Sequence, residues 1–300
     1  QLLSGFRQKH RSVSPKFFYD ERGSELFTAI TRTPEYYPTR TEMGLLQAHG
    51  QEMADCIGTD STLLEYGSGS SEKIRLLLET LKPRTYLPMD ISKSFLRDEA
   101  QKLSREYPWL EVHAVCSDFT VSMELPDYSR DARKVVFFPG SSIGNFDPEF
   151  AADFLTRIKD ILGSDGGLLI GVDLKKEAKI LNAAYNDRQG LTAAFNLNLL
   201  TRMNRELGAD FDLGAFDHVA FYNEKLGRIE MHLCSKKEQG VQVGECVLEF
   251  SEGETIHTEN SYKYTAAEFE KLAGGAGLTL EKLWTDDNDW FGLFYFTVAA

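Results

Sequence analysis

Short apolar runs and longer amphipathic stretches alternate between residues 60 and 175. The apolar runs are bounded by turn-forming residues and predict strands at 62–66, 85–89, 111–115, 135–139 and 167–172. The stretches between most of these runs have helical spacing and predict helices at 71–81, 92–106 and 148–162. Because strands that alternate with helices build parallel sheets covered by helices, this region predicts an α/β fold with a doubly wound sheet.

The flanking regions have other patterns. Residues 1–40 are rich in aromatic and turn-forming residues and contain one predicted helix, at 24–31, which an amphipathic helix follows at 41–56. Residues 176–207 predict one or two polar helices. Alternating apolar and polar positions within 216–257, clearest at 228–233 and 241–250, predict an antiparallel sheet with one exposed face.

The last part of the chain returns to the first pattern. A predicted helix at 265–275 precedes two predicted strands, 278–285 and 291–298, that flank a polar turn and would complete the first sheet. We therefore predict two domains, a core of residues 41–175 and 263–300 and a second domain of residues 1–40 and 176–262.

Charge and hydropathy exclude several classes of partner. The chain has 300 residues, of which 33 are basic and 46 acidic, giving a net charge of −13. Nucleic acids are bound largely through Lys and Arg that neutralise phosphates, so the acidic balance argues against nucleic acid and against an anionic membrane surface. The apolar runs are also shorter than the ~18 residues of a membrane helix.

The four cysteines, Cys56, Cys116, Cys234 and Cys246, are scattered, without a CxxC pair and without a histidine at ligand spacing. This argues against a zinc site and against a disulfide framework, so we expect no metal and a reducing, cytoplasmic location. The sequence begins at Gln1 without an initiator Met or a signal h-region, and we expect a short leader to precede it.

A glycine turn follows the first predicted strand. Gly67 and Gly69 allow a sharp turn and a close backbone approach to a ligand at the start of a helix, although a purely structural turn would look the same. Glu65 precedes the turn, Asp90 ends the second strand, and Asp118 with Phe119 follows the third.

Each of these residues has an ordinary explanation. Asp90 can cap a helix, and Phe119 can belong to the core. Together, at the carboxyl ends of successive strands, they predict a nucleoside site. The third glycine of a dinucleotide fingerprint is missing, and acidic neighbours suit the positive sulfonium of S-adenosylmethionine better than a phosphate. We therefore predict a methyl donor as cofactor.

The loop after the fourth strand carries Asn145, whose amide both donates and accepts hydrogen bonds and suits the ammonium and carboxylate of an amino acid. Asn145 could instead stabilise the turn before Asp147. The Asn/Asp-Pro-Pro-aromatic signature of nucleobase amino methylation is absent from this loop.

Six segments resemble one known family, the histidine-specific Nα-methyltransferases of ergothioneine biosynthesis. They are YDERGS at 19–24, PEYYPTRTE at 34–42, GSGSSEK at 67–73, GSSIGN at 140–145, NRELGADF at 204–211 and IEM at 229–231. The resemblance extends from about residue 10 to 300, and the tyrosine-rich segment is more specific than the glycine turn. It implies a Rossmann-like class I methyltransferase sheet with an inserted α+β substrate-binding domain.

The resemblance also implies a reaction. S-adenosylmethionine would methylate the α-amino nitrogen of L-histidine three times, giving Nα,Nα,Nα-trimethylhistidine (hercynine). The implied catalytic residues are Tyr19, which would orient the amine, and Asn145. The implied substrate-binding residues are Tyr37, Tyr185, Met231, Glu259 and Ser261, of which the last two would bind the imidazole. The implied cofactor-binding residues are Gly67, Lys73, Asp90, Asp118 and Phe119.

The residues themselves are consistent with the imidazole pocket. Glu259 and Ser261 are two positions apart, so on a strand they project from one face while Asn260 points away. Three alternatives stay open. The chain could methylate another amino acid or a thiolated histidine, or it could bind a nucleoside without catalysis. It could also be an NAD-dependent oxidoreductase, an alternative that the missing third glycine argues against. In each case we expect a monomer that binds small molecules.

Overall fold

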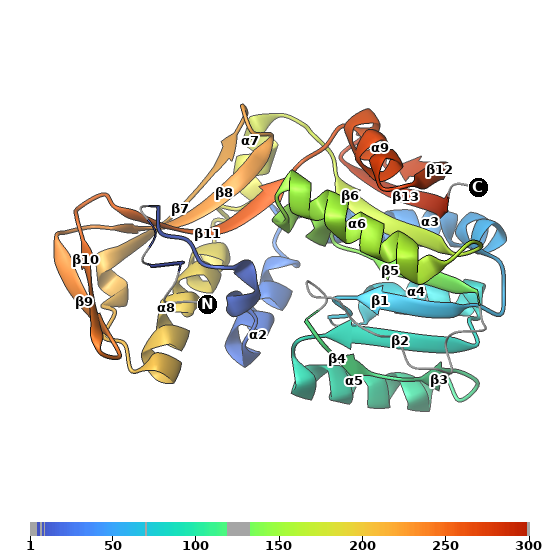
Figure 1. Ribbon diagram of the computed structural model, residues 1–300, viewed down its shortest axis with the longest axis horizontal. Coiled ribbons are helices and arrows are strands. Elements are labelled where there is room, and N and C mark those ends of the chain that lie inside the picture. Colours follow the sequence, from blue (N-terminus) through green and yellow to red (C-terminus); the bar gives the residue numbers. More distant parts are fainter. Residues whose placement is uncertain (1–4, 7, 9, 70, 119–132, 299–300) are drawn as a thin grey trace. The chain divides into compact units, whose positions relative to one another are not determined.

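The computed structural model describes residues 5, 6, 8, 10–69, 71–118 and 133–298 (Figure 1). The chain forms two compact units. Unit 1 comprises Gln1–Tyr37 and Lys176–Tyr262, and unit 2 comprises Pro38–Lys175 and Lys263–Ala300. The sheet of unit 2 is interrupted in sequence by the larger part of unit 1.

Unit 2 is built on a mostly parallel sheet with the strand order β12-β13-β6-β5-β1-β2-β3, in which β4 also pairs with β2. β13 runs antiparallel to both its neighbours, and the other pairs are parallel. The predicted α/β sheet is thereby confirmed. The strands are β1 (Thr62–Tyr66), β2 (Thr85–Asp90), β3 (Glu111–Val112), β4 (Val115–Cys116), β5 (Lys134–Phe138), β6 (Gly167–Asp173), β12 (Leu278–Thr285) and β13 (Phe291–Val298).

One predicted strand of this sheet is wrong in detail. Residues 111–115 form two short pieces, β3 and β4, that pair with opposite ends of β2. These pieces lie at the edge of the sheet with their residues exposed or half-buried. Few buried side chains therefore hold the segment to a continuous ladder.

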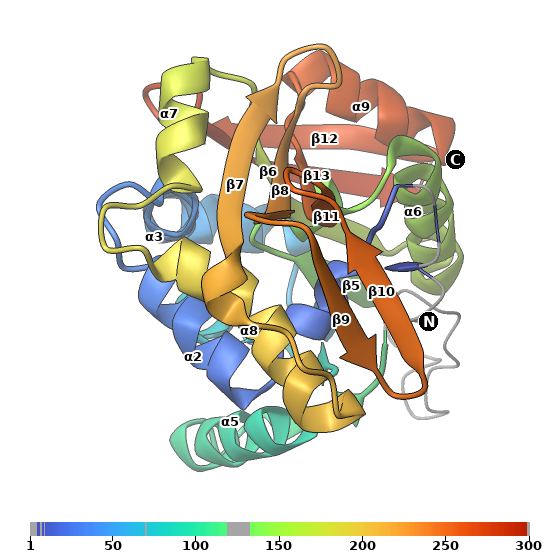
Figure 2. The same ribbon diagram turned by 90° about the vertical axis from the view of Figure 1, so that its left-hand side faces the viewer.

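Helices cover both faces of this sheet. Figures 1 and 2 show α6 and α9 on one face and α3 on the other. α3 begins four residues before the predicted start, because Pro38 fits the first turn of a helix, where no N–H is needed. The helices are α3 (Tyr37–Ile57), α4 (Glu72–Leu81), α5 (Lys93–Glu106), α6 (Pro148–Leu162) and α9 (Ala266–Gly275), with the short 3₁₀ helix η3 (Ser142–Asn145).

Unit 1 is built on an antiparallel sheet with the order β11-β8-β7 and a separate hairpin, β9–β10. The predicted stretch 241–250 is in fact this hairpin, because Gly244 adopts a φ of 58° and starts a two-residue turn. The strands are β7 (Phe216–Asn223), β8 (Arg228–Ser235), β9 (Gln239–Val243), β10 (Cys246–Phe250) and β11 (Thr255–Tyr262).

The helices of unit 1 pack beside its sheet. α8 contacts both β7 and β8, and Figure 2 shows α7 and α8 alongside β7. These helices are α2 (Glu21–Ile30), α7 (Ala178–Ala184) and α8 (Leu191–Leu207), with the short 3₁₀ helices η1 (Pro15–Phe18) and η4 (Leu213–Ala215). Ile229, Met231 and Leu233 are buried on one face of β8, and the other face carries Glu230 and His232 beside the exposed Val219 and Phe221 of β7.

Candidate functional site

The turn after β1 in unit 2 brings a carboxylate close to backbone N–H groups. Gly67 and Gly69 have φ angles of 71° and 48°, which favour glycine. The N–H of Gly67 donates to the carbonyl of Met89 at 2.8 Å, and the N–H of Gly69 lies 3.4 Å from Asp90 Oδ2. Asp90 Oδ1 accepts from the N–H of Ser92 at 2.9 Å. The glycine turn and Asp90 thus meet where β1 separates β2 from β5, the point at which α/β sheets bind ligands.

Of two carboxyl groups near this turn, Glu65 is buried and Asp90 is half-buried. Burial raises the pKa of Asp90, against the opposing effect of hydrogen bonds from backbone N–H groups. Glu65, in β1, is 1% exposed, and burial raises its pKa to about 8 although it accepts a hydrogen bond from the Tyr86 hydroxyl. Glu65 is therefore largely protonated at pH 7, and its carboxyl can donate as well as accept.

Lys73 is half-buried and forms an ion pair with a buried carboxylate. Its Nζ lies 2.6 Å from Glu42 Oε2, and the Glu42 carboxylate also accepts from the N–H of Gly140 at 2.9 and 3.0 Å. Glu42 is fully buried. Gly140 has a φ of 79°, and a Cβ there would lie 3.3 Å from Lys73 Nζ. The pair therefore joins α3, α4 and the loop after β5.

Sequence reasoning missed Glu42 as a site residue. The signal was available: in a helix, Glu42 falls on the same face as Leu45 and Leu46, which are buried. A charged residue within an apolar helical stripe indicates a buried partner, since a lone buried charge is costly.

The other predicted residues of unit 2 are placed as follows. Asp118 lies two residues after β4 and is half-buried. Phe119 lies outside the described residues. Asn145 is half-buried at the end of η3, which follows Ser141, a residue with a φ of 56°. Ser141 Oγ accepts from the N–H of Asp173 at 2.9 Å, which ties this loop to the end of β6.

In unit 1, a β-bulge sets the direction of the predicted imidazole-binding residues. His257 pairs with His232, but Glu259 pairs with Met231, so Thr258 is the extra residue. Ser261, two positions after Glu259, shares its face of β11, and Met231 lies directly across on β8.

The opposite face of β11 and β8 carries Asn260 and Glu230. Asn260 pairs with Glu230 and points away from Glu259, as the sequence spacing predicted. The bulge therefore lets His257 and Glu259, two residues apart, lie on opposite faces of one strand.

Tyr185 joins this group through its hydroxyl, which donates to Ser261 Oγ at 2.9 Å. Its backbone carbonyl faces Nε2 of His218 at 3.0 Å, and Nδ1 of His218 faces Asn196 Nδ2 at 2.9 Å. Because an amide nitrogen only donates, Nδ1 accepts and Nε2–H donates to Tyr185. Burial lowers the pKa of His218, which is consistent with this neutral form.

A row of aromatic rings leads from Tyr185 to Tyr19. The centroids of Tyr185 and Tyr36 are 6.3 Å apart, those of Tyr36 and Phe27 6.1 Å, and those of Phe27 and Tyr19 5.8 Å. Phe195 packs against Tyr19 at 5.8 Å. The sequence analysis gave Phe27 and Tyr36 no role, because an aromatic residue in an aromatic-rich segment carries no separate signal.

Tyr37 lies outside this aromatic row and contacts Lys176. Lys176 Nζ donates to the Tyr37 hydroxyl at 2.7 Å and lies 4.5 Å from the centroid of its ring. Tyr37 is almost fully buried. The structure thus groups Tyr185, Ser261 and the pair Glu259–Met231, connects Tyr19 to them through aromatic contacts, and gives Tyr37 a separate partner.

The sequence matches, over residues 1–298, the family described as histidine-specific, S-adenosylmethionine-dependent methyltransferases. The chain belongs to this family. It is 43% identical over 298 residues to the histidine N-alpha-methyltransferases of Mycobacterium tuberculosis and Mycolicibacterium smegmatis, with 97% of this chain and 92% of each relative covered. It is 33% identical to ergothioneine biosynthesis protein 1 of Neurospora crassa, of which it covers 34%.

The fold of this methyltransferase is also that of a solved structure. An S-adenosylmethionine-dependent methyltransferase from Clostridium acetobutylicum aligns with 92% of this chain and 96% of its own length, with a TM-score of 0.50 and 11% identity. At this identity the likeness shows the fold alone.

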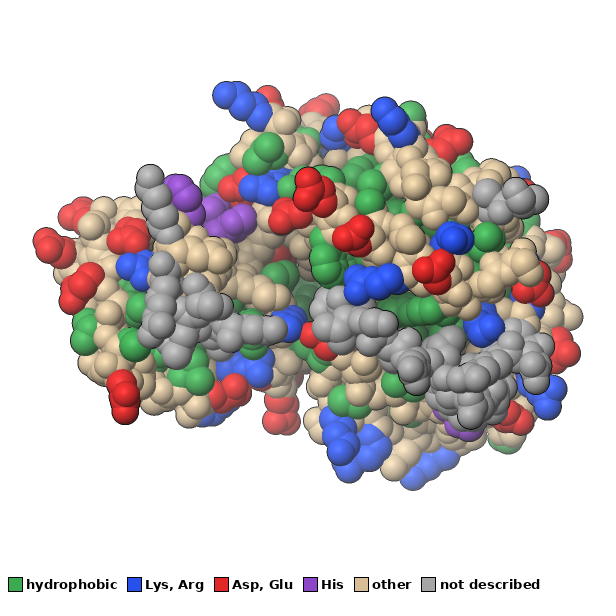
Figure 3. Space-filling model, viewed as in Figure 1, with side chains coloured by type: hydrophobic (Ala, Val, Ile, Leu, Met, Phe, Trp, Pro, Cys, Tyr) green, Lys and Arg blue, Asp and Glu red, His purple; other side chains and the backbone are tan. Residues whose placement is uncertain are grey.

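The charges of unit 2 fit the cofactor of the methyltransferase, S-adenosylmethionine, which carries a positive sulfonium and no phosphate. At the strand ends Asp90 and Asp118 supply carboxylates, while the ammonium of Lys73 is already paired with Glu42. Figure 3 shows basic side chains interspersed with acidic ones in each unit on the face that it draws. Within the described part of the chain, no helix combines the length and apolarity needed to cross a membrane.

Proposed function

We propose that this methyltransferase trimethylates the α-amino nitrogen of L-histidine and gives hercynine, a step of ergothioneine biosynthesis. Bound S-adenosylmethionine supplies the electrophilic methyl group. The observation that carries the substrate assignment is the shared face of Glu259, Ser261 and Met231, with the Tyr185 hydroxyl donating to Ser261 Oγ at 2.9 Å.

This face supplies the two kinds of hydrogen bond that a neutral imidazole requires. Because Ser261 Oγ accepts from Tyr185, the hydrogen of the serine hydroxyl can be donated onward to the unprotonated ring nitrogen. The Glu259 carboxylate can accept from the ring N–H, and a charge-assisted bond of this kind is stronger than a neutral one. Met231 would pack against the ring.

The α-amino group must be unprotonated and held about 3 Å from the methyl carbon. We propose that Tyr19 orients the amine and that Tyr37 and Asn145 bind the backbone groups of the amino acid. Tyr19 lies in the aromatic row described above, whose packing restricts its ring. Positioning by these side chains accounts for the catalysis, without a strong general base.

The cofactor contacts are proposed from the strand ends of unit 2. Asp90, beside the glycine turn at Gly67, would bind the ribose hydroxyls, and Asp118 with Phe119 would bind the adenine. Lys73 would act mainly through Glu42 and Gly140, which it holds beside the turn.

Mass spectrometry tests the proposal. The purified chain is incubated with S-adenosylmethionine and a mixture of the proteinogenic amino acids, and a parallel reaction contains a thiolated histidine. We expect histidine alone to gain three methyl groups. Methylation of another amino acid, or of the thiolated histidine alone, would remove the substrate assignment, and binding of the cofactor without any methylation would indicate a protein that lost catalysis.

Two matched variants separate the two groups of residues. Glu259→Gln should raise the KM for histidine by at least about tenfold, since it replaces a charge-assisted bond worth about 1.5–3 kcal/mol, and should leave the Kd for S-adenosylmethionine unchanged. Asp90→Asn should raise the Kd for S-adenosylmethionine and leave the KM for histidine unchanged. Unchanged histidine kinetics in Glu259→Gln would place this carboxylate outside the pocket.

We further propose a monomer in a reducing compartment, the cytoplasm. All four cysteines are free thiols, and one chain supplies all the residues proposed to bind the two ligands. Sedimentation velocity would measure the oligomeric state.

A further inference from the structure

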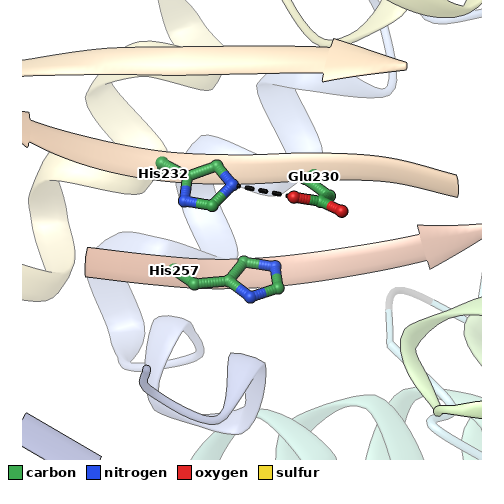
Figure 4. Close-up of side chains that lie close together, drawn as sticks. All are labelled: Glu230, His232 and His257. Atoms are coloured by element: carbon green, nitrogen blue, oxygen red, sulfur yellow. Dashed lines mark hydrogen bonds and ion pairs between the residues drawn. The ribbon is translucent and has the colours of Figure 1, made fainter. Parts of the chain in front are cut away.

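The polar face of the β7-β8-β11 sheet carries a second cluster of chemically active side chains. Glu230 and His232 are two positions apart on β8 and project from one face. His257 lies directly across from His232 on β11. Figure 4 shows the three side chains together on these two strands. They lie on the opposite face from Met231, Glu259 and Ser261.

The three groups are close enough to share one ion. Nε2 of His232 lies 3.1 Å from Glu230 Oε2, and the two imidazole rings stack with centroids 4.6 Å apart and planes tilted by 17°. One donor atom from each of the three residues lies within 4.8 Å of the other two. Within the described residues, this is the only such group of three histidine, cysteine or acidic side chains.

We propose that Glu230, His232 and His257 form a zinc-binding site. Two imidazole nitrogens and one carboxylate oxygen are a ligand set that Zn²⁺ prefers, with water in the fourth position. Tetrahedral Zn²⁺ with bonds of about 2.0–2.1 Å places its ligand atoms roughly 3.3 Å apart. Glu230 and His232 already have this spacing, so His257 would make the larger adjustment.

Both histidine rings have further contacts that the adjustment would change. His257 is half-buried, and its backbone is held on the other side by residues 11–13, where His257 N–H donates to the carbonyl of Arg11 at 2.9 Å. Its backbone is therefore fixed, and its Nε2 lies 3.0 Å from the carbonyl of Glu259, a contact that bound metal would replace when the ring turns. Nδ1 of His232 is buried and has no hydrogen-bond partner among the described residues. The ring of His232 stacks on His257 on one side and on Phe221, 5.6 Å away, on the other.

Arg228 limits how the carboxylate can bind the metal. Its guanidinium lies 2.8 Å from Glu230 Oε1. The metal would therefore take Oε2, the oxygen that faces His232, and Glu230 would bind through one oxygen. Bound zinc would clamp β8 to β11 from the face opposite the proposed histidine pocket.

The spacing of histidines in the sequence argued against a zinc site, and the structure shows why that argument was incomplete. His232 and His257 belong to strands separated by the β9–β10 hairpin, and only the antiparallel pairing of β8 with β11 brings them together. Local spacing motifs detect ligands within one turn or loop and not across a sheet.

Calorimetric titration of the tag-free chain with ZnCl₂, without histidine, tests the site. We expect one Zn²⁺ per chain, no binding of Mg²⁺, and an affinity for Zn²⁺ at least about tenfold lower in His257→Gln. His49→Gln is the matched control, because His49 Nδ1 also lies 3.1 Å from a carboxylate, that of Glu52, on α3. This control should bind Zn²⁺ as the wild type does.

Two further measurements keep the result decisive. Zn²⁺ should raise the Tm of the wild type and not that of His257→Gln, and His257→Cys should restore binding because a thiolate also binds Zn²⁺. No binding by the wild type, or equal affinity in His257→Gln, would overturn the proposal, the second outcome indicating adventitious zinc elsewhere. None of these readouts needs turnover, so they are independent of the proposed function.

Discussion

The two groups of proposed ligand-binding residues are built in different ways. In unit 2 the groups lie at strand ends, where turns place Gly67, Asp90 and Asn145 directly after β1, in β2 and after β5. In unit 1, Glu259 and Ser261 lie within a strand, and their direction depends on pairing with β8 and on one bulge. A strand-end site depends on local turns, whereas a mid-strand site depends on the register of residues far apart in the chain.

The ion pair beneath the glycine turn should show the largest effect. Lys73→Met leaves the fully buried Glu42 carboxylate without its ammonium partner. Removing one partner of a buried pair costs about 3–5 kcal/mol, so we expect a fall of this size in the free energy of unfolding, measured by urea denaturation. The Kd for S-adenosylmethionine should rise as well.

The double variant separates charge from packing. In Glu42→Gln/Lys73→Met the amide oxygen can still accept from the N–H of Gly140, and no buried charge is left alone. Its loss should be smaller than that of Lys73→Met. If the double variant loses as much unfolding free energy as Lys73→Met and Glu42→Gln lose together when each is made alone, the two residues do not interact.

Glu65 should give unit 2 a pH dependence. Burial raises its pKa from an ordinary value of 4.5 to about 8. Between these pH values the folded chain holds a proton that the unfolded chain has released, so stability falls as pH rises, by up to about 1.4 kcal/mol per pH unit. Glu65→Gln removes this dependence. Its stability relative to the wild type should therefore increase from pH 6 to pH 8 by about 2–3 kcal/mol and level off above that.

Urea denaturation at several pH values measures this difference. The hydrogen bond from Tyr86 does not affect this difference, because the Gln amide oxygen still accepts from the hydroxyl at every pH compared. Stability curves that stay parallel from pH 6 to pH 8 would show that Glu65 is ionised in the folded chain.

The comparison also explains what the sequence could predict. The bounds predicted for the strands 62–66, 278–285 and 291–298 coincide with β1, β12 and β13, because turn-forming residues stand within two positions of the start of each. The glycine turn and Asp90 were recognisable for the same reason. The residue types at these turns are a local signal, although the contacts of Gly67 with Met89 and of Gly69 with Asp90 also need the parallel pairing of β1 with β2.

Features that depend on pairing across the chain were not predictable in this way. The turn at Gly244 splits an apparently continuous alternation into β9 and β10. The bulge at Thr258 and the stacking of His232 on His257 follow from the register of β11 on β8. The shared face of Glu259 and Ser261 was predicted, because both lie after the bulge and keep the ordinary two-residue period.

The bulge offers a test of the mid-strand arrangement. The Thr258 hydroxyl donates to the carbonyl of Met231 at 3.0 Å, and the side chain is 1% exposed. Thr258→Val keeps the shape and leaves that carbonyl without its hydroxyl donor, which costs about 1–2 kcal/mol. We expect a fall of this size in unfolding free energy and a higher KM for histidine, with the Kd for S-adenosylmethionine unchanged. Equal changes for both ligands would mean that the bulge acts on the whole fold.

The smallest effects should come from two neighbours on opposite faces. Ser261→Ala removes a hydroxyl that accepts from Tyr185 and is proposed to donate to the imidazole, a loss of about 1 kcal/mol. We therefore expect the KM for histidine to rise by several-fold. Asn260→Ala changes the adjacent residue, which pairs with Glu230 on the other face, and should alter that KM less than twofold.

Initial rates at saturating S-adenosylmethionine measure both values, and circular dichroism confirms that each variant is folded. The contrast depends only on the pleat of β11, because the two side chains are adjacent in sequence and differ in the face from which they project. A larger KM change in Asn260→Ala than in Ser261→Ala would contradict the placement of histidine on the face of Glu259 and Ser261.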